Sequence, residues 1–345
     1  MMGFDQRAAR QTFTVVVVLA LLYALYLART TIFVFILALL FAYLLSPLVN
    51  LINRILPNRK TQALGLALAY VIFLAILVTV GALIGTTVAD QASALAKQAP
   101  NMLAKLQASL AATKGTGSFE DQALNVLRAQ TISGSSELLN SAPQYLPKIL
   151  AAASELIYVV IIPILGFFFL KDGHDFRQHA LTLAEGRTRE FLDDLMADIH
   201  LLLAHYMRAL VGLSLVAFTA YSIFFSILGV PYPLLLAAVG GFFEFIPMLG
   251  PLAGGAIIVT VAGVSGTGVV TVLIFLVLFR LIQDYVISPH LMGQGVELHP
   301  LLVIFGVFAG AEIAGIRGSF LSVPLLAMAR VFYVRLRRRK IAATT

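Results

Sequence analysis

Residues 63–88 read ALGLALAYVIFLAILVTVGALIGTTV, and no side chain in this run carries a charge. The run is longer than the ~20 residues that an α-helix needs to cross the hydrocarbon core of a bilayer. Comparable runs occupy roughly 13–28, 32–50, 149–170 and 201–229. The sequence therefore predicts an all-α, polytopic helical membrane protein.

The composition of the chain supports this class and excludes several others. Of its 345 residues, 60% are hydrophobic and only 12% are charged, whereas a soluble domain has ~25% charged residues. The absence of cysteine excludes disulfides, thiolate metal sites and a catalytic thiol. The histidines lack the spacing of a metal-binding motif such as His-Glu-x-x-His. We expect no metal and no cofactor.

Two polar segments interrupt the apolar runs, at 89–148 and 171–200. In the first, apolar residues recur at helical spacing, which indicates amphipathic helices on the membrane or on the protein itself. In the second, Lys171-Asp-Gly is expected to end the fourth span. A stripe at i, i+4 and i+8 (Phe191, Leu195, Ile199) then predicts a water-exposed helix that continues into the fifth span.

The distribution of Lys and Arg predicts the orientation. With the N-terminus inside, the inside segments 1–12, 51–62, 171–200 and the C-terminal tail hold fifteen basic residues, and the outside loops hold six. By the positive-inside rule, both termini are expected in the cytoplasm. The basic run from Arg330 to Lys340 is typical of a contact with anionic lipid rather than with nucleic acid.

The apolar region 233–262 contains GGFFEFIPMLGP at 240–251. Its carboxylate, Glu244, is costly to place at bilayer depth, by at least ~2.5 kcal/mol on insertion scales. Pro247, Gly250 and Pro251 then break the helix, and irregular backbone at this depth survives only beside protein or a water-filled cavity. Desolvation of Glu244 among aromatic residues would suit proton coupling.

The topology of the last third stays open at this point. Residues 233–262 form either one kinked span or a re-entrant hairpin that turns at Pro247–Pro251. Residues 299–332 likewise form either one broken helix or a hairpin that turns near Gly315–Gly318. Two spans give eight crossings, and two hairpins give six.

Three motifs resemble the AI-2E family of bacterial transporters: EFIPMLGP at 244–251, QDYVISPHLMG at 283–293 and VELHP at 296–300. The resemblance implies about eight membrane segments, homo-oligomeric assembly, a place in the bacterial inner membrane and secondary transport. The family is named after export of autoinducer-2, and other members look like sodium(lithium)/proton antiporters. Arg208-Ala209 departs from the Arg-Gly pair that the family commonly has where the fifth span begins.

The chain then divides into six expected regions. Residues 1–88 form an N-terminal transmembrane scaffold, 89–148 an extracytoplasmic insert and 149–170 a span. A cytoplasmic helical insert at 171–200, a transport core at 201–332 and a basic cytoplasmic tail at 333–345 follow.

The candidate site gathers ionisable residues and helix breakers within this core. Arg280 and Asp284 are spaced i, i+4 and can pair on one helix face, whereas Glu312 and Arg317 would face each other only if the chain turns at Gly315. The residues expected to bind a polar solute, a monovalent cation or a proton are Glu244, Pro247, Gly250, Pro251, Arg280, Gln283, Asp284, Glu312, Arg317 and Arg208.

The predicted function is that of a secondary transporter that exports a small polar solute or exchanges a monovalent cation for protons. A non-transporting membrane scaffold that recruits partners through its polar inserts is the alternative. An intramembrane hydrolase built on the Ser265 of Gly263–Gly266 is disfavoured, because no histidine base lies well inside a span. No Gly-Lys dipeptide occurs, so no phosphate-binding loop for ATP is present. We predict no enzymatic activity.

Overall fold

The computed structural model describes residues 6–55, 62–112, 156–266, 268–292 and 298–342. Most of the predicted extracytoplasmic insert (113–148), the first residues of the fourth span (149–155) and the end of the tail (343–345) lie outside these ranges. The elements within them are helices, which confirms the all-α class.

The helices follow one another along the chain as α1 (Gln6–Leu27), α2 (Arg29–Ile55), α3 (Gln62–Ala112), α5 (Leu156–Thr182), α6 (Gly186–Ile227), α7 (Pro233–Phe243), α8 (Leu249–Val264), α9 (Val269–Ile282), the π-helical segment η3 (Gln283–Ile287), α10 (Ser288–Met292) and α11 (Pro300–Ala342). Six helices of the described part are long and apolar enough to cross a membrane. Their outward side chains are largely apolar, as a lipid-facing surface requires.

Two helices extend further than the sequence predicted. α3 continues from its apolar run through residue 112, so the first part of the polar insert belongs to the same helix. α5 passes through Lys171–Gly173 and ends only at Thr182, so the helix continues beyond the tripeptide that is expected to end the fourth span. In the added turns, Arg177 binds Asp193 of α6, with 2.7 Å between its NH2 and Oδ1.

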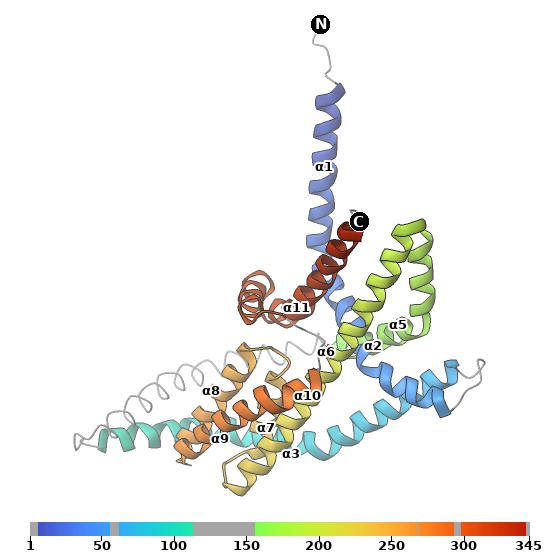
Figure 1. Cartoon of the computed structure of the whole chain (residues 1–345). Helices are drawn as coiled ribbons and strands as arrows, with labels where there is room; N and C mark the ends of the chain where they lie inside the picture. Colours follow the sequence, from blue (N-terminus) through green and yellow to red (C-terminus); the bar gives the residue numbers. More distant parts are fainter. Residues whose placement is uncertain (1–5, 56–61, 113–155, 267, 293–297, 343–345) are drawn as a thin grey trace.

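α6 is the central helix of the molecule (Figure 1). Its 42 residues give a length of about 63 Å, roughly twice the thickness of a hydrocarbon core. The helix therefore extends well beyond its apolar part, and its polar first half runs into the fifth span as predicted.

Each half of α6 packs into a separate apolar core. The first half packs against α2 and α11 through Leu203, Tyr206 and Leu210, which meet Leu40 and Val307. The second half packs against α7, α8 and α9 in a cluster that contains Tyr221, Phe225, Leu236, Ile258, Val272 and Phe279.

The last third of the chain contains two helical hairpins. α7 and α8 pack against each other, with Gly254 beside Phe243. Within α11 the backbone leaves helical geometry at Ala314 and Gly315, and beyond this bend the Ser319 hydroxyl donates to the Val307 carbonyl, at 3.1 Å. Both broken segments therefore fold back on themselves.

Candidate functional site

The candidate site begins at the break between α7 and α8. Glu244, Phe245 and Ile246 continue α7 as a tighter turn, each donating its N–H to the carbonyl three residues earlier. Proline cannot donate to a helical carbonyl, and after Pro247 the chain reverses at Met248, whose φ is 64°. Non-glycine residues rarely adopt positive φ, and such strain is frequent at functional sites.

Gly250 allows the two helices of the hairpin to approach each other closely. A Cβ atom at this position would collide with the backbone carbonyl oxygen of Phe243. The Gly250 N–H donates to the Ile246 carbonyl at 2.9 Å, and the Leu249 N–H donates to the Pro247 carbonyl at 2.8 Å. The break therefore uses several of its own carbonyls internally, and Pro251 lies in the first turn of α8.

Glu244 is buried at this break, with 6% of its surface exposed. Its Oε2 accepts a hydrogen bond from Nε2 of Gln283 at 2.6 Å. The NH1 of Arg280 lies 3.8 Å from the same oxygen. A buried charge needs both pairing and hydrogen bonding, and helix α9 with its π-helical continuation supplies both.

Arg280 also binds a second carboxylate. Its Nε donates to Oδ2 of Asp284 at 2.9 Å, which confirms the pairing predicted from the i, i+4 spacing. The side chains of Arg280 and Asp284 are 38% and 45% exposed, so they form the accessible side of the cluster. Glu244 forms its buried side.

Gln283 occupies the first position of the π-helical segment η3. Single π turns inside α-helices are rare and occur often at functional sites. Gln283 is 3% exposed, and its Oε1 has no hydrogen-bond partner among the described residues. An amide can donate through nitrogen to a carboxylate and accept through oxygen from a carboxylic acid. Gln283 therefore suits both protonation states of Glu244.

Two polar residues of α6 that the sequence did not single out also belong to this region. The Ser214 hydroxyl donates to the Gly241 carbonyl at 2.8 Å. Tyr221 packs against Gly240, and its ring centroid lies 5.0 Å from that of Phe279. Their only signal in the sequence is that they are polar residues within an apolar span.

The other predicted site residues lie elsewhere. The Nε of Arg208 donates to the Ala204 carbonyl of its own helix at 2.9 Å. The guanidinium of Arg317 lies 5.3 Å from the ring centroid of Phe33 in α2. Glu312 is exposed beside the bend of α11. The chain does turn at Gly315, as a pairing of Glu312 with Arg317 would require.

The polar groups of the motifs outside this cluster have local structural partners. The Ser265 hydroxyl donates to the Val261 carbonyl at 2.6 Å, at the end of α8. His299 precedes α11, where its Nδ1 accepts from the Leu301 N–H at 3.2 Å, so this histidine lies at the start of a helix. Among the residues that the structure describes, no three His, Cys, Asp or Glu side chains are grouped as a metal site would require.

Comparison with known proteins extends the resemblance over the chain. The model of the family described as "AI-2E family transporter" matches residues 15–338. "Putative transport protein YueF" of Bacillus subtilis (strain 168) is 26% identical over 309 residues, which cover 86% of this chain and 81% of the relative. "Putative permease PerM" of Escherichia coli (strain K12) is 25% identical over 285 residues, 78% of this chain and 79% of the relative. The family match spans both cores and the whole Glu244 cluster, and the chain therefore belongs to the AI-2E family of transporters.

Proposed function

We propose that the protein is a secondary transporter that exports a small polar solute or exchanges a monovalent cation for protons, with Glu244 as the coupling residue. The observation that carries this proposal is the hydrogen bond between Gln283 and the buried carboxylate of Glu244. This bond joins two irregular segments, the α7–α8 break and the π-helical turn. Broken helices within the membrane are the usual place for a transported solute or coupling ion.

The charges of the cluster favour exchange of one positive charge at a time. Glu244 and Asp284 both lie against the single guanidinium of Arg280. When both carboxylates are ionised, one negative charge in the cluster is not compensated. A proton or a monovalent cation would neutralise this negative charge. The two would compete, because either one is sufficient to neutralise it.

The path to Glu244 would lead past Arg280 and Asp284, which form the accessible side of the cluster. A cation that enters there meets Asp284 first. Its arrival would weaken the hold of Arg280 on that carboxylate and leave the guanidinium available to Glu244. The exchange would thus move Arg280 between two acids that the structure already places beside it.

The α7–α8 hairpin is the proposed moving part. α7 has 11 residues and therefore a length of about 16 Å, half of the ~30 Å hydrocarbon core. A re-entrant hairpin of this length would place Glu244 near mid-depth. Only a tight turn joins α7 to α8. We therefore propose that the hairpin of these two helices rocks against α6 and α9 as the charge on Glu244 changes.

Contacts between distant segments support the proposed orientation, with both termini in the cytoplasm of a bacterium and the protein in its inner membrane. Arg335 near the C-terminus binds Asp198 of the 171–200 region, and both were predicted to lie inside. On the opposite side, the Tyr232 hydroxyl donates to Gln98 at 2.9 Å, and Gln98 belongs to the insert that was predicted to lie outside. We further propose homo-oligomeric assembly, with contacts through the N-terminal helices.

The test is flux through the purified protein in proteoliposomes under an imposed proton gradient, with sodium, lithium and autoinducer-2 as solutes. Glu244→Gln keeps the shape of the side chain and removes its charge, and we expect it to abolish proton-coupled flux. Glu190→Gln makes the same chemical change at an exposed position outside the candidate site and is the matched control. If the proton-coupled flux of Glu244→Gln equals that of the wild type, the proposal is refuted.

A further inference from the structure

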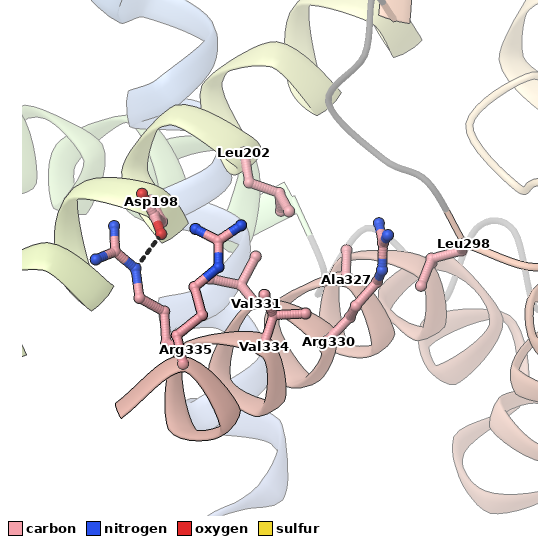
Figure 2. A pocket seen from close by; sticks show the side chains of 9 residues that line it. Asp198, Leu202, Leu298, Ala327, Arg330, Val331, Val334 and Arg335 are labelled. Atoms are coloured by element: carbon pink, nitrogen blue, oxygen red, sulfur yellow. Dashed lines mark hydrogen bonds and ion pairs between the residues drawn. The ribbon is translucent and has the colours of Figure 1, made fainter. Parts of the chain in front are cut away.

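A cavity lies far along α6 from the Glu244 cluster, where the first half of this helix faces the end of α11. Its volume is about 200 Å³. Figure 2 shows Arg335 at one end of this cavity, hydrogen-bonded to Asp198, and Arg330 at the other end beside Leu298. The cavity lies on the side of the protein that the charge distribution assigns to the cytoplasm.

Arg335 fixes the geometry of the cavity. Its Nε donates to Oδ2 of Asp198 and its NH1 donates to Oδ2 of Asp194, both at 2.6 Å. The hydrogen bond from Arg335 lowers the pKa of Asp198, so this carboxylate is ionised and engaged at neutral pH. Arg335 compensates the charge of one of the two acids, and the two other arginines of the lining more than offset the charge of the second.

The remaining basic side chains of the lining are Arg330 and Arg338, whose residues are exposed. Between them the wall is apolar and is formed by Leu202, Val331 and Val334. A pocket with a basic rim and an apolar wall, at the end of two membrane helices, matches a ligand with an anionic head and a hydrocarbon body. Basic pockets between transmembrane helices on the cytoplasmic side bind anionic lipid head groups.

We propose that this pocket binds the phosphate of an anionic phospholipid, with Arg330 and Arg338 on the phosphate and the adjoining carbons against Leu202 and Val334. Arginine suits this role because its planar guanidinium donates two parallel hydrogen bonds to a phosphate. The bound lipid would link α6 to the end of α11, as the Arg335 clamp does. This assignment is independent of what the Glu244 cluster transports.

The experiment measures binding of short-chain phosphatidylglycerol to the purified full chain in a neutral detergent by native mass spectrometry. The pocket variant is Arg330→Gln/Arg338→Gln. The matched control is Arg187→Gln/Arg337→Gln, which removes two exposed positive charges that do not line the pocket. We expect the pocket variant to bind about 25-fold more weakly than the wild type, about fivefold for each arginine, and the control to change by less than about threefold.

Three further arms decide between the outcomes. Arg338→Lys keeps the positive charge and should retain most of the binding, while short-chain phosphatidylcholine, which has no net charge, should bind weakly to every variant. Inorganic phosphate tests the head group alone. If phosphate displaces the lipid completely at millimolar concentration, the occupant is a soluble phosphate compound and the lipid assignment fails. Equal losses in the pocket and control variants would reduce the effect to general surface charge and overturn the proposal.

Discussion

Substitution of Gly250 by alanine tests whether the close contact inside the α7–α8 hairpin positions Glu244. A Cβ atom at Gly250 would overlap the backbone carbonyl oxygen of Phe243. The obstacle is main chain, so no rotation of a side chain can relieve the overlap, and the hairpin has to open. Overpacking of this kind costs about 1–3 kcal/mol. The opening moves the turn that carries Glu244 away from Gln283.

Gly255, in the same helix, provides the control. Its nearest neighbour outside its own helix, Cδ1 of Leu276, would be 4.0 Å from an added Cβ, which is ordinary contact. Because glycine in a helix interior is less stable than alanine by roughly 0.5–1 kcal/mol, Gly255→Ala should leave the protein unchanged or slightly more stable. Each variant adds one methyl group to the same helix. Comparing them therefore separates the effect of the clash from the effect of helix propensity.

The assay is unfolding of the purified protein in mixed micelles by titration with sodium dodecyl sulfate, followed by circular dichroism. We expect the free energy of unfolding to fall by about 1–3 kcal/mol for Gly250→Ala and not to fall for Gly255→Ala. Proteoliposome flux should be lost in the first variant and kept in the second. If both variants unfold at the same detergent fraction as the wild type, the close contact contributes nothing and the reasoning is refuted.

Three further predictions concern the clusters and the topology. Gln283→Leu removes a hydrogen bond to a buried charge worth about 1.5–3 kcal/mol, so flux should fall at least about tenfold, and unchanged flux would contradict the role of Gln283. Because the pKa of Asp198 is lowered from 3.8, the Arg335→Gln variant should be less stable than the wild type at neutral pH. That difference should shrink as the pH falls through the lowered value, and a constant difference would argue against the ion pair. A single cysteine at Gln294, which lies between α10 and α11 in the sequence and outside the described residues, should be labelled from the cytoplasmic side. Outside labelling would favour eight spans over two hairpins.

The fold class could be predicted because it depends on composition and run length alone. A long uncharged run such as 63–88 has few alternatives to a membrane helix. The residues at which the helices end were harder to predict from the sequence, as α5 shows. The added turns lie beside α6, where Arg177 binds Asp193, and no local pattern in the sequence records this contact.

The candidate site shows the same division between local and distant contacts. The pair of Arg280 and Asp284 followed from helical periodicity, since both residues lie on one helix. The contact of Gln283 with Glu244 joins the π-helical turn to the α7–α8 break and depends on how these segments pack, which no local pattern records. The clamp of Arg335 on Asp198 is equally non-local, and the sequence identified its arginine only as part of a basic tail.

The π-helical turn at Gln283–Ile287 has a consequence for how this family can diverge. A π turn holds one residue more than the α-helical turn it replaces, and each residue of a regular helix rotates the chain by about 100°. Loss of a single residue there would turn Arg280 and all of α9 by that angle relative to α10, and a cluster assembled from α9 and from the turn itself would come apart. Insertions and deletions should therefore be excluded from this stretch in every relative that keeps the Glu244 cluster, even where the amino acids themselves change.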